Sequence, residues 1–490
     1  MNARLTRVFI SLGDLYVAYR KAKVEAYYES THFHALAFTE YEQNLHENLS
    51  RLHQLLLKPG FAWSSDLAFI GDFAYLPKSI DSSAWNSDAN GHFRALDPLV
   101  DWEQRFNESK SRAPAKLRLV IRPTVDFQVV SALWIIKVGH LFDGVINSML
   151  SYGNRLRRSY SESGDVRVGE PAINLTAIGL FVPYFSAYRT WREKGLSAME
   201  RSLEGGKNIL AITMDIEQFY HRVSPKFLLR KGFLESIKLS LNRQETIFTK
   251  ALLTAIDIWY KSTPDYADRP EGAIPVGLSA SKIIANVLLS NFDNDLVGRL
   301  NPIYYGRYVD DIFLVFENLE GLTTAGQVTK HIADVLAPNL ILKNRGSELQ
   351  SLKLRLSYAS DSELLFAGKK QKIFALSSSH GLDLIQHIRE QIRVQSSEYR
   401  LLPAVPTSGI RMASKALLAT PDATLRVDAL RKADVVSVRR LGLSLLLRDL
   451  EAYSADLHPE SWIDVRKEFY GLVKRHVLTP PAPRHFKWVA

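Results

Sequence analysis

The chain has 490 residues and no cysteine, and its 62 Lys and Arg residues exceed its 52 Asp and Glu residues by ten. Without cysteine there is no disulfide, thiolate zinc site, iron–sulfur cluster or cysteine nucleophile, so a bound metal would be held by carboxylates, carbonyls or imidazoles. Such ligands favour a hard ion such as Mg²⁺. A hydrophobic content of 46% predicts large buried cores rather than disorder. The positive excess permits a nucleic-acid partner without proving one.

The first sixty residues have apolar and aromatic side chains at nearly helical spacing, and we predict helices that end at Pro59-Gly60. Charges such as Asp14, Arg20 and Lys21 interrupt the first apolar run, so it does not fit a secretory signal. No stretch approaches about 18 uncharged apolar residues, the length of a spanning helix. We therefore expect a cytoplasmic protein without membrane contact.

The rest of the chain alternates between strand and helix patterns. Residues 61–110 are rich in Trp, Asp, Ser and Asn and predict loops with short strands. The remaining expected elements are a half-exposed strand at 116–123, a long helix at 126–158, an apolar strand at 209–215, a helix at 279–296, two β segments within 303–316, and basic helices after 381.

Two of these segments deliver aspartates to a strand end. The strand at 209–215 ends in Asp215, and Asp310-Asp311 lies roughly 95 residues later between two apolar β segments. Aspartates among apolar strand residues are costly unless cations pair with them. A tight turn would let both adjacent aspartates approach a pair of ions, and such a cluster suits two-metal phosphoryl transfer. The alternative for Asp310-Asp311 alone is an ordinary surface turn.

The order of these motifs resembles that of reverse transcriptases over residues 116–376. YVDD at 308–311 resembles the family's palm motif, and DIEQFY at 215–220 resembles the palm motif that precedes it. The resemblance implies that Asp215, Asp310 and Asp311 are catalytic. It also implies that these three and Ile216 surround two Mg²⁺ ions, or Mn²⁺.

Within this resemblance, two further residues would meet the incoming nucleotide. Tyr220 holds the position of the aromatic residue that rejects ribonucleotides, and its alternative role is that of an ordinary buried aromatic. IPVGLSASKIIANVLLSNFD at 274–293 resembles the intermediate motif, in which Gly277 would let the backbone approach the nucleotide. Val276 replaces the usual Gln, which would alter template contacts. For Asn286 and Asp293, local hydrogen bonding is favoured over direct catalysis.

Basic residues complete the implied nucleotide site. Lys116, Arg118 and Arg122 alternate along the strand at 116–123, which resembles the strand that grips the triphosphate. Lys343, in LILKNRG at 340–346, is the candidate that donates a proton to pyrophosphate. The alternative for the three strand residues is a solvated face.

Nucleic-acid contacts are expected at two further places. Arg155 and Arg157 follow the predicted long helix and would contact template phosphates or face water. LLFAGKKQKI at 364–373 resembles the primer-grip hairpin, whose Lys369, Lys370 and Lys372 would contact primer or template phosphates. Phosphate contacts position a nucleic acid without reading its sequence.

The resemblance implies an α+β right-hand polymerase with fingers and an antiparallel-sheet palm. A helical N-terminal extension would precede the fingers, and a helical, thumb-like C-terminal domain would follow the palm. The predicted domains are 1–110 for the extension, 111–205 for the fingers, 206–380 for the palm and 381–490 for the thumb-like domain.

The implied activity is RNA-directed DNA synthesis from dNTPs. The layout and Pro-Val-Gly in place of Pro-Gln-Gly resemble the bacterial antiphage reverse transcriptases, that is, the abortive-infection and unknown-group defence-associated enzymes. That resemblance implies a non-coding RNA template, a DNA product and a possible homo-oligomer. Two alternatives remain, namely template-independent or protein-primed synthesis on the same core, and a catalytically idle RNA-binding scaffold. The candidate priming hydroxyls are Tyr27, Tyr28, Tyr41, Tyr399, Tyr453 and Tyr470.

Overall fold

The structure is a computed structural model of the whole chain. It describes residues 4–29, 31, 34–80, 100, 115–159, 172–318, 321–343, 350–368 and 371–395, together with 418–419, 437–438, 467 and 470. Within these ranges helices and antiparallel sheets are mixed, which confirms the α+β class.

The helices and strands are as follows. The α-helices are α1 (Leu12–Tyr28), α2 (Ala35–Gln43), α3 (Leu45–Leu57), α4 (Leu67–Ile70), α6 (Val125–Trp134), α7 (His140–Gly144), α8 (Tyr184–Glu204), α9 (Phe219–Arg222), α10 (Lys231–Ser236), α11 (Arg243–Lys261), α12 (Asp265–Asp268), α13 (Ser279–Leu288), α14 (Ser290–Leu300), α15 (Ala325–Val335) and α16 (Gly381–Gln395). The strands are β1 (Gly71–Ile80), β2 (Ala115–Pro123), β3 (Arg158–Ser159), β4 (Ala172–Ile173), β5 (Ile209–Asp215), β6 (Tyr304–Tyr308), β7 (Asp311–Glu317), β8 (Leu340–Lys343), β9 (Ser351–Leu354), β10 (Leu364–Phe366), β11 (Lys372–Leu376), β12 (Leu418–Ala419) and β13 (Ser437–Val438). The 3₁₀ turns are Ala62–Ser65, Pro225–Leu229 and Ser357–Ala359, and Ile135–Gly139 is a π-helical turn.

The N-terminal helices were predicted correctly up to Pro59-Gly60, and they pack onto the rest of the protein. Ser11 and Asp14 form a capping box that fixes the start of α1. Lys21 is buried and donates to the carbonyls of Asn174 and Gly179, at 3.0 and 2.9 Å. Glu25 accepts the backbone N–H of Leu180 at 2.7 Å. Helix α1 is therefore anchored to the loop before α8.

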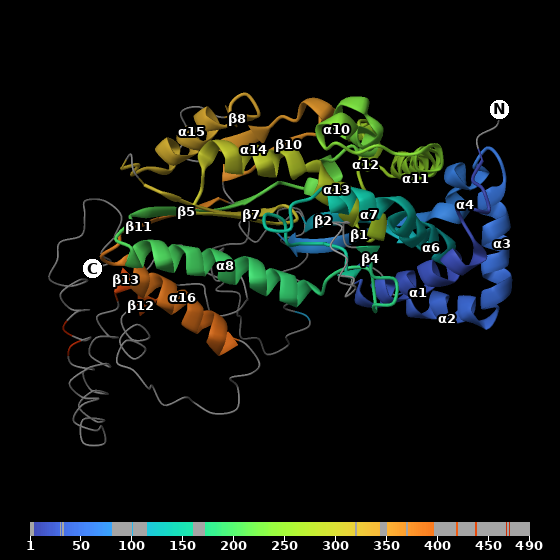
Figure 1. Cartoon of the computed structure of the whole chain (residues 1–490), viewed down its shortest axis with the longest axis horizontal. Coiled ribbons are helices and arrows are strands. Elements are labelled where there is room, and N and C mark those ends of the chain that lie inside the picture. The colour runs from blue at the N-terminus through green and yellow to red at the C-terminus, as the bar shows by residue number, and fades with distance from the viewer. Residues whose placement is uncertain are drawn as a thin grey trace, which may run out of the picture.

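The central element is a four-stranded antiparallel sheet in the order β11-β5-β7-β6. Residues Ile209–Met214 of β5 are all buried, as are the five central residues of β7. Such continuous apolar runs are needed because the middle strands are covered on both faces. Helix α8 packs on β5, β6 and β7, and α16 packs on α8. Figure 1 shows α8 and α16 on one side of the sheet and α14 and α15 on the other.

The predicted helix at 126–158 is shorter than expected. The helical segment α6, the π-helical turn and α7 run from Val125 to Gly144, and the chain then turns toward β6, where Ser151 forms a bridge with Arg307. Among the described residues, Val125–Gly144 is long and apolar enough to cross a membrane, but 78% of its most apolar window is buried inside the protein. Burial of that kind is what a core helix shows, so it gives only weak support for a membrane span.

The helix predicted at 279–296 is also interrupted. It divides at Leu289 into α13 and α14. Helix α13 packs on α6 and α7, and its Asn286 accepts a hydrogen bond from Arg307 of β6, so it connects the region of the predicted fingers to the central sheet.

The hairpin predicted at 364–373 does not form as a self-paired unit. Strand β10 pairs with β9 in a second sheet of order β10-β9-β8, whereas β11 pairs with β5 at the edge of the central sheet. An isolated bridge between Ile216 and Phe366 joins the two sheets. The segment therefore connects two sheets, because each of its strands finds a partner elsewhere.

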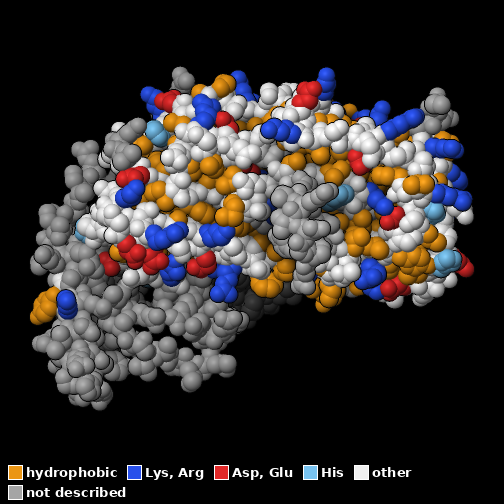
Figure 2. Space-filling view, viewed as in Figure 1, with side chains coloured by type: hydrophobic (Ala, Val, Ile, Leu, Met, Phe, Trp, Pro, Cys, Tyr) orange, Lys and Arg blue, Asp and Glu red, His pale blue; other side chains and the backbone are white. Residues whose placement is uncertain are grey.

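Of the predicted helical C-terminal domain, the described part is α16 together with the short pair β12–β13 and residues 467 and 470. The domain boundaries stay predictions. On the face shown in Figure 2, Lys and Arg side chains are interspersed with Asp and Glu rather than gathered into one stripe. Part of this mixture is internal pairing, since Arg389 of α16 lies 3.6 Å from Glu193 and 3.0 Å from Glu200 of α8.

Candidate active site

The three predicted catalytic aspartates meet at one end of the central sheet. Asp215 is the last residue of β5 and lies directly opposite Asp311, the first residue of β7. Asp310 lies in the tight turn between β6 and β7, and its carbonyl accepts the backbone N–H of Ile216 at 3.4 Å. The backbone therefore brings together two motifs that are far apart in the sequence.

These residues supply the hard oxygen donors that Mg²⁺ prefers, and Ile216 would add only its backbone carbonyl. However, among the residues that the structure describes, no three acidic or histidine side chains form a group ready to hold a metal. Three ionised carboxylates without a cation repel one another. The residues fit a divalent ion by donor type and backbone placement, and binding would have to draw their side chains together.

Tyr220 lies on α9, close to this end of the sheet. Burial raises the pKa of its hydroxyl, and the negative charges of Asp310 and Glu29 raise it further. Asn154 donates to the hydroxyl oxygen at 3.4 Å. The phenol is thus neutral and stands within electrostatic reach of Asp310, and its contact with the sugar of a nucleotide stays a prediction.

Gly277 occupies a position that only glycine adopts easily. Its φ is +101°, and an added Cβ would lie 2.9 Å from Thr31 Oγ1 and 3.4 Å from the Ile121 carbonyl. The neighbouring Val276 carbonyl accepts the N–H of Ile121 at 3.0 Å. The structure therefore explains this glycine by contact with β2 and the segment after α1, and nucleotide contact stays a prediction.

The predicted triphosphate-binding strand is present as β2, paired with β1. Arg118 and Arg122 are exposed on it, and Lys116 lies on the same strand. The positive charge of Arg118 acts on His221 of α9, which places Arg118 near the segment that follows Asp215. Two of the three predicted basic residues are thus available to an anionic ligand.

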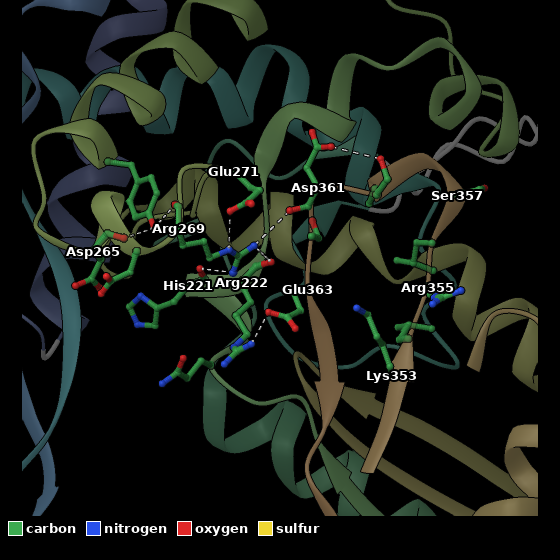
Figure 3. A pocket seen from close by; sticks show the side chains of 18 residues that line it. His221, Arg222, Asp265, Arg269, Glu271, Lys353, Arg355, Ser357, Asp361 and Glu363 are labelled. Carbon is green, nitrogen blue, oxygen red and sulfur yellow. Dashed lines mark hydrogen bonds and ion pairs between the residues drawn. The ribbon is translucent and has the colours of Figure 1, made fainter. Parts of the chain in front are cut away.

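A cavity of about 900 Å³ lies beside the segment that follows Asp215 (Figure 3). Its lining comes from Gln218 and α9, from α12 and the loop after it, and from residues 353–363. Arg222 and Glu363 form an ion pair of 2.8 Å across it. Basic and acidic side chains are nearly balanced in the lining, and the three aspartates are not part of it. The cavity therefore borders the segment that follows Asp215 and does not include the three predicted catalytic aspartates.

His221 lines this cavity, and its environment makes the stability of the folded protein depend on pH. Burial lowers the pKa of His221 to about 4, and Arg118, Lys78 and Arg269 also lower it, against the opposing charge of Asp265. Below its ordinary pKa of about 6.5 the unfolded chain takes up a proton that the folded protein refuses, so stability is lost as the pH falls toward 4.

We therefore expect His221→Asn to lose less stability than the wild type between pH 7 and pH 4. Thermal unfolding of both proteins across this range measures the difference, with pH 8 as the reference at which histidine does not titrate. A melting-temperature difference that stays constant with pH would contradict the expectation.

Arg155 requires a correction. Its Nε lies 2.8 Å from Asp143, and its other nitrogens donate to the carbonyls of Ser151, Asp143 and Ile146. Arg158 binds the other oxygen of Asp143 at 3.0 Å. The guanidinium of Arg155 is thus used inside the protein rather than offered to a template, because the buried Asp143 needs compensation. Arg157 donates to the carbonyl of Phe181 at 2.9 Å, and its template contact stays a prediction.

The other predicted basic residues are less informative. Lys343 ends β8 in the second sheet, and it lies 4.0 Å from Glu363. Lys372 begins β11, opposite Thr213 of the central sheet. Lys369 and Lys370 lie outside the described residues.

One residue that sequence reasoning missed is Arg307, on β6. It is fully buried and pairs with Asp293 at 2.7 Å. Asn286 binds it as well, so Asn286 and Asp293 do form structural hydrogen bonds, but these bonds reach β6 and are not local to the helix as expected. A possible signal was the single charge in the apolar segment IYYGRYV.

An aspartate at the end of β5 and an aspartate pair at the adjoining hairpin turn give the arrangement of carboxylates that two-metal phosphoryl transfer would need. The sequence model of the family described as reverse transcriptase (RNA-dependent DNA polymerase) matches residues 109–370, more than half of the chain. The chain belongs to this family. It is an RNA-directed DNA polymerase, a nucleotidyltransferase, and membership implies a right-hand polymerase fold with RNA template, dNTP substrates and DNA product. No curated protein matches the sequence.

Proposed function

We propose that the protein extends a 3′-hydroxyl with dNTPs by two-metal phosphoryl transfer, and that Asp215, Asp310 and Asp311 hold the metals. The pairing of Asp215 with Asp311 across β5 and β7, next to Asp310 in the turn, carries this proposal. Reverse transcriptases generally use divalent metals. When bound, two Mg²⁺ ions would activate the hydroxyl and neutralise the leaving pyrophosphate.

The side chains around the aspartates have separate tasks in this proposal. Arg118 and Arg122 bind the triphosphate oxygens, because guanidinium groups form paired hydrogen bonds with phosphate. Tyr220 packs against the sugar and excludes a 2′-hydroxyl. Its proximity to Asp310 and its neutral hydroxyl support this task.

The Tyr220 role predicts a change of sugar selectivity. Tyr220→Val should raise the kcat/KM for ribonucleotides relative to deoxyribonucleotides roughly ten- to a hundredfold, the range by which pocket size discriminates. Single-nucleotide incorporation with paired CTP and dCTP measures the ratio. Tyr220→Phe, which keeps the ring, is the matched control. If Tyr220→Val left the sugar selectivity unchanged, the proposal that Tyr220 excludes a 2′-hydroxyl would be wrong.

We further propose that the enzyme acts in bacterial antiphage defence with a dedicated non-coding RNA. The layout of the chain and Val276 in the intermediate motif support this class. The test is to purify the protein from cells, sequence the RNA bound to it, and sequence the DNA made when dNTPs are added. DNA complementary to one enriched RNA is the expected result, and DNA unrelated to any bound RNA would overturn it.

Protein-primed synthesis is the second candidate, and one observation favours it. Tyr27 and Tyr28 are 82% and 75% exposed at the end of α1, and they directly precede Glu29, whose charge acts on Tyr220. By contrast, Tyr41 donates to Asp126 at 2.7 Å and is partly buried. DNA that stays attached to the protein in denaturant would identify this mode. An idle scaffold would bind RNA in a salt-dependent way and incorporate no dNTP.

A further inference from the structure

The buried Arg307 lies three residues before Asp310. Its exposed fraction is 0%, and a charge in such a place must be compensated. Asp293 of α14 provides the compensation, with its carboxylate oxygens 2.8 Å from Nε and 2.7 Å from one terminal nitrogen. Tyr305 donates to the same carboxylate at 2.5 Å and fixes its orientation.

Every N–H of the Arg307 guanidinium has an acceptor. Beyond the bonds to Asp293, Nη2 donates to the carbonyl of Asn286 at 3.1 Å, and Nη1 donates to the side-chain oxygen of Asn286 at 2.8 Å. The remaining N–H donates to the carbonyl of Val309 at 2.8 Å. All five donors of the planar group are therefore used, and one of them reaches the catalytic turn itself.

Val309 is the residue that this bond holds. Its φ is +59°, a region that a β-branched residue rarely occupies and that must be stabilised by its surroundings. On the other side of the turn, a Cβ at Gly153 would come within 2.8 Å of Val309 Cγ2. The turn is thus fixed between Arg307 and the segment at Gly153.

We propose that Arg307 is a positioning residue for catalysis, because its bond to the Val309 carbonyl keeps the turn in the conformation that sets Asp311 opposite Asp215 and Asp310 next to it. This inference rests on the proposed catalytic role of the three aspartates. The partners of Arg307 lie on α13 and α14, within the motif at 274–293. This motif therefore supports the turn between β6 and β7 through the Arg307 side chain.

Arg307→Lys separates the positioning role from the charge. Lysine keeps the positive charge beside Asp293, but its three donors on one atom do not span Asp293, Asn286 and the Val309 carbonyl together. We expect a folded protein whose kcat falls roughly ten- to a hundredfold with little change in the KM for dNTP, since displacement of catalytic groups by about 1 Å has effects of this size. A kcat equal to that of the wild type would overturn the proposal.

A second variant tests the turn directly. Glycine adopts positive φ without the steric cost of a Cβ, so adding Val309→Gly to Arg307→Lys should restore part of the lost kcat if the turn conformation is the defect. Val309→Gly alone is the matched control. A defect of core stability would not be repaired in this way, and absence of any recovery would count against the proposal.

A double variant keeps the proposal testable if Arg307→Lys does not fold. It combines Arg307→Met with Asp293→Leu. Replacing a buried ion pair by apolar residues is often tolerated, so this double variant should fold and still have a reduced kcat. A folded double variant with full kcat would overturn the inference.

Amide hydrogen exchange of residues 304–312 gives a readout that needs no activity. Exchange should be faster in Arg307→Lys than in the wild type, and equal exchange would contradict the proposal. An inactive wild type with faster exchange in the variant would instead refute the catalytic assignment and leave the structural bond established.

Discussion

Replacing both Asp310 and Asp311 with alanine should abolish dNTP incorporation while the protein still folds. Both side chains lie at the turn between β6 and β7 and are only half-buried, so neither contributes to the core. Removing them takes away most of the carboxylates that would hold the metals, and without these ions neither the attacking hydroxyl nor the leaving pyrophosphate is stabilised.

The measurement is primer extension with Mg²⁺ and with Mn²⁺, accompanied by thermal unfolding. Asp334→Ala, which removes an exposed carboxylate from α15, is the control and should retain activity. Incorporation by the double variant at the wild-type rate would eliminate the catalytic assignment. A loss of folding in the double variant would show that these carboxylates are structural.

Asp143→Asn should cause the largest loss of stability among single carboxylate changes considered for this protein. Asp143 is fully buried, and it lies between Arg155 at 2.8 Å and Arg158 at 3.0 Å. Its removal leaves two guanidinium groups, each with only 13% of its side chain exposed, without their anion. Breaking a buried ion pair on one side costs about 3–5 kcal/mol.

Denaturant unfolding measures this change in the free energy of unfolding. Asp257→Asn is the matched control, because Asp257 pairs with Lys261 on the surface of α11 at 2.7 Å, where such pairs contribute about 0.3–0.5 kcal/mol. Equal losses for the two variants would mean that Asp143 does not stabilise the turn after α7. The comparison also tests why Arg155 is unsuited to template binding.

Elements with a strong local pattern were predicted well. The strand predicted at 209–215 matches β5 to the residue, and the two β segments around Asp310-Asp311 match β6 and β7. Strands β5 and β7 have long, largely apolar runs that end at a charge, so neighbouring residues suffice to define them. The hairpin predicted at 364–373 was wrong, because strand pairing depends on the whole fold. Strand β10 pairs with β9, and β11 pairs with β5.

The roles of individual side chains were also hard to predict where they depend on partners from distant elements. For Arg155 the sequence shows only a basic residue near a predicted helix, and a solvated or template-facing position was the natural expectation. The structure places the buried Asp143 beside it, and electrostatic compensation then decides its orientation. Arg307 was overlooked for the converse reason, since an internal role for a charged residue depends on partners from α13 and α14.

The sequence by itself determined the family, the order of the motifs and which aspartates are candidates for catalysis, because these depend on residue type and spacing along the chain. The absence of cysteine also restricted any metal chemistry to oxygen and nitrogen donors. Tertiary structure decided which charges remain available for a ligand. Burial forces arginines and aspartates to compensate one another, and that pairing follows from which elements pack together rather than from the local sequence.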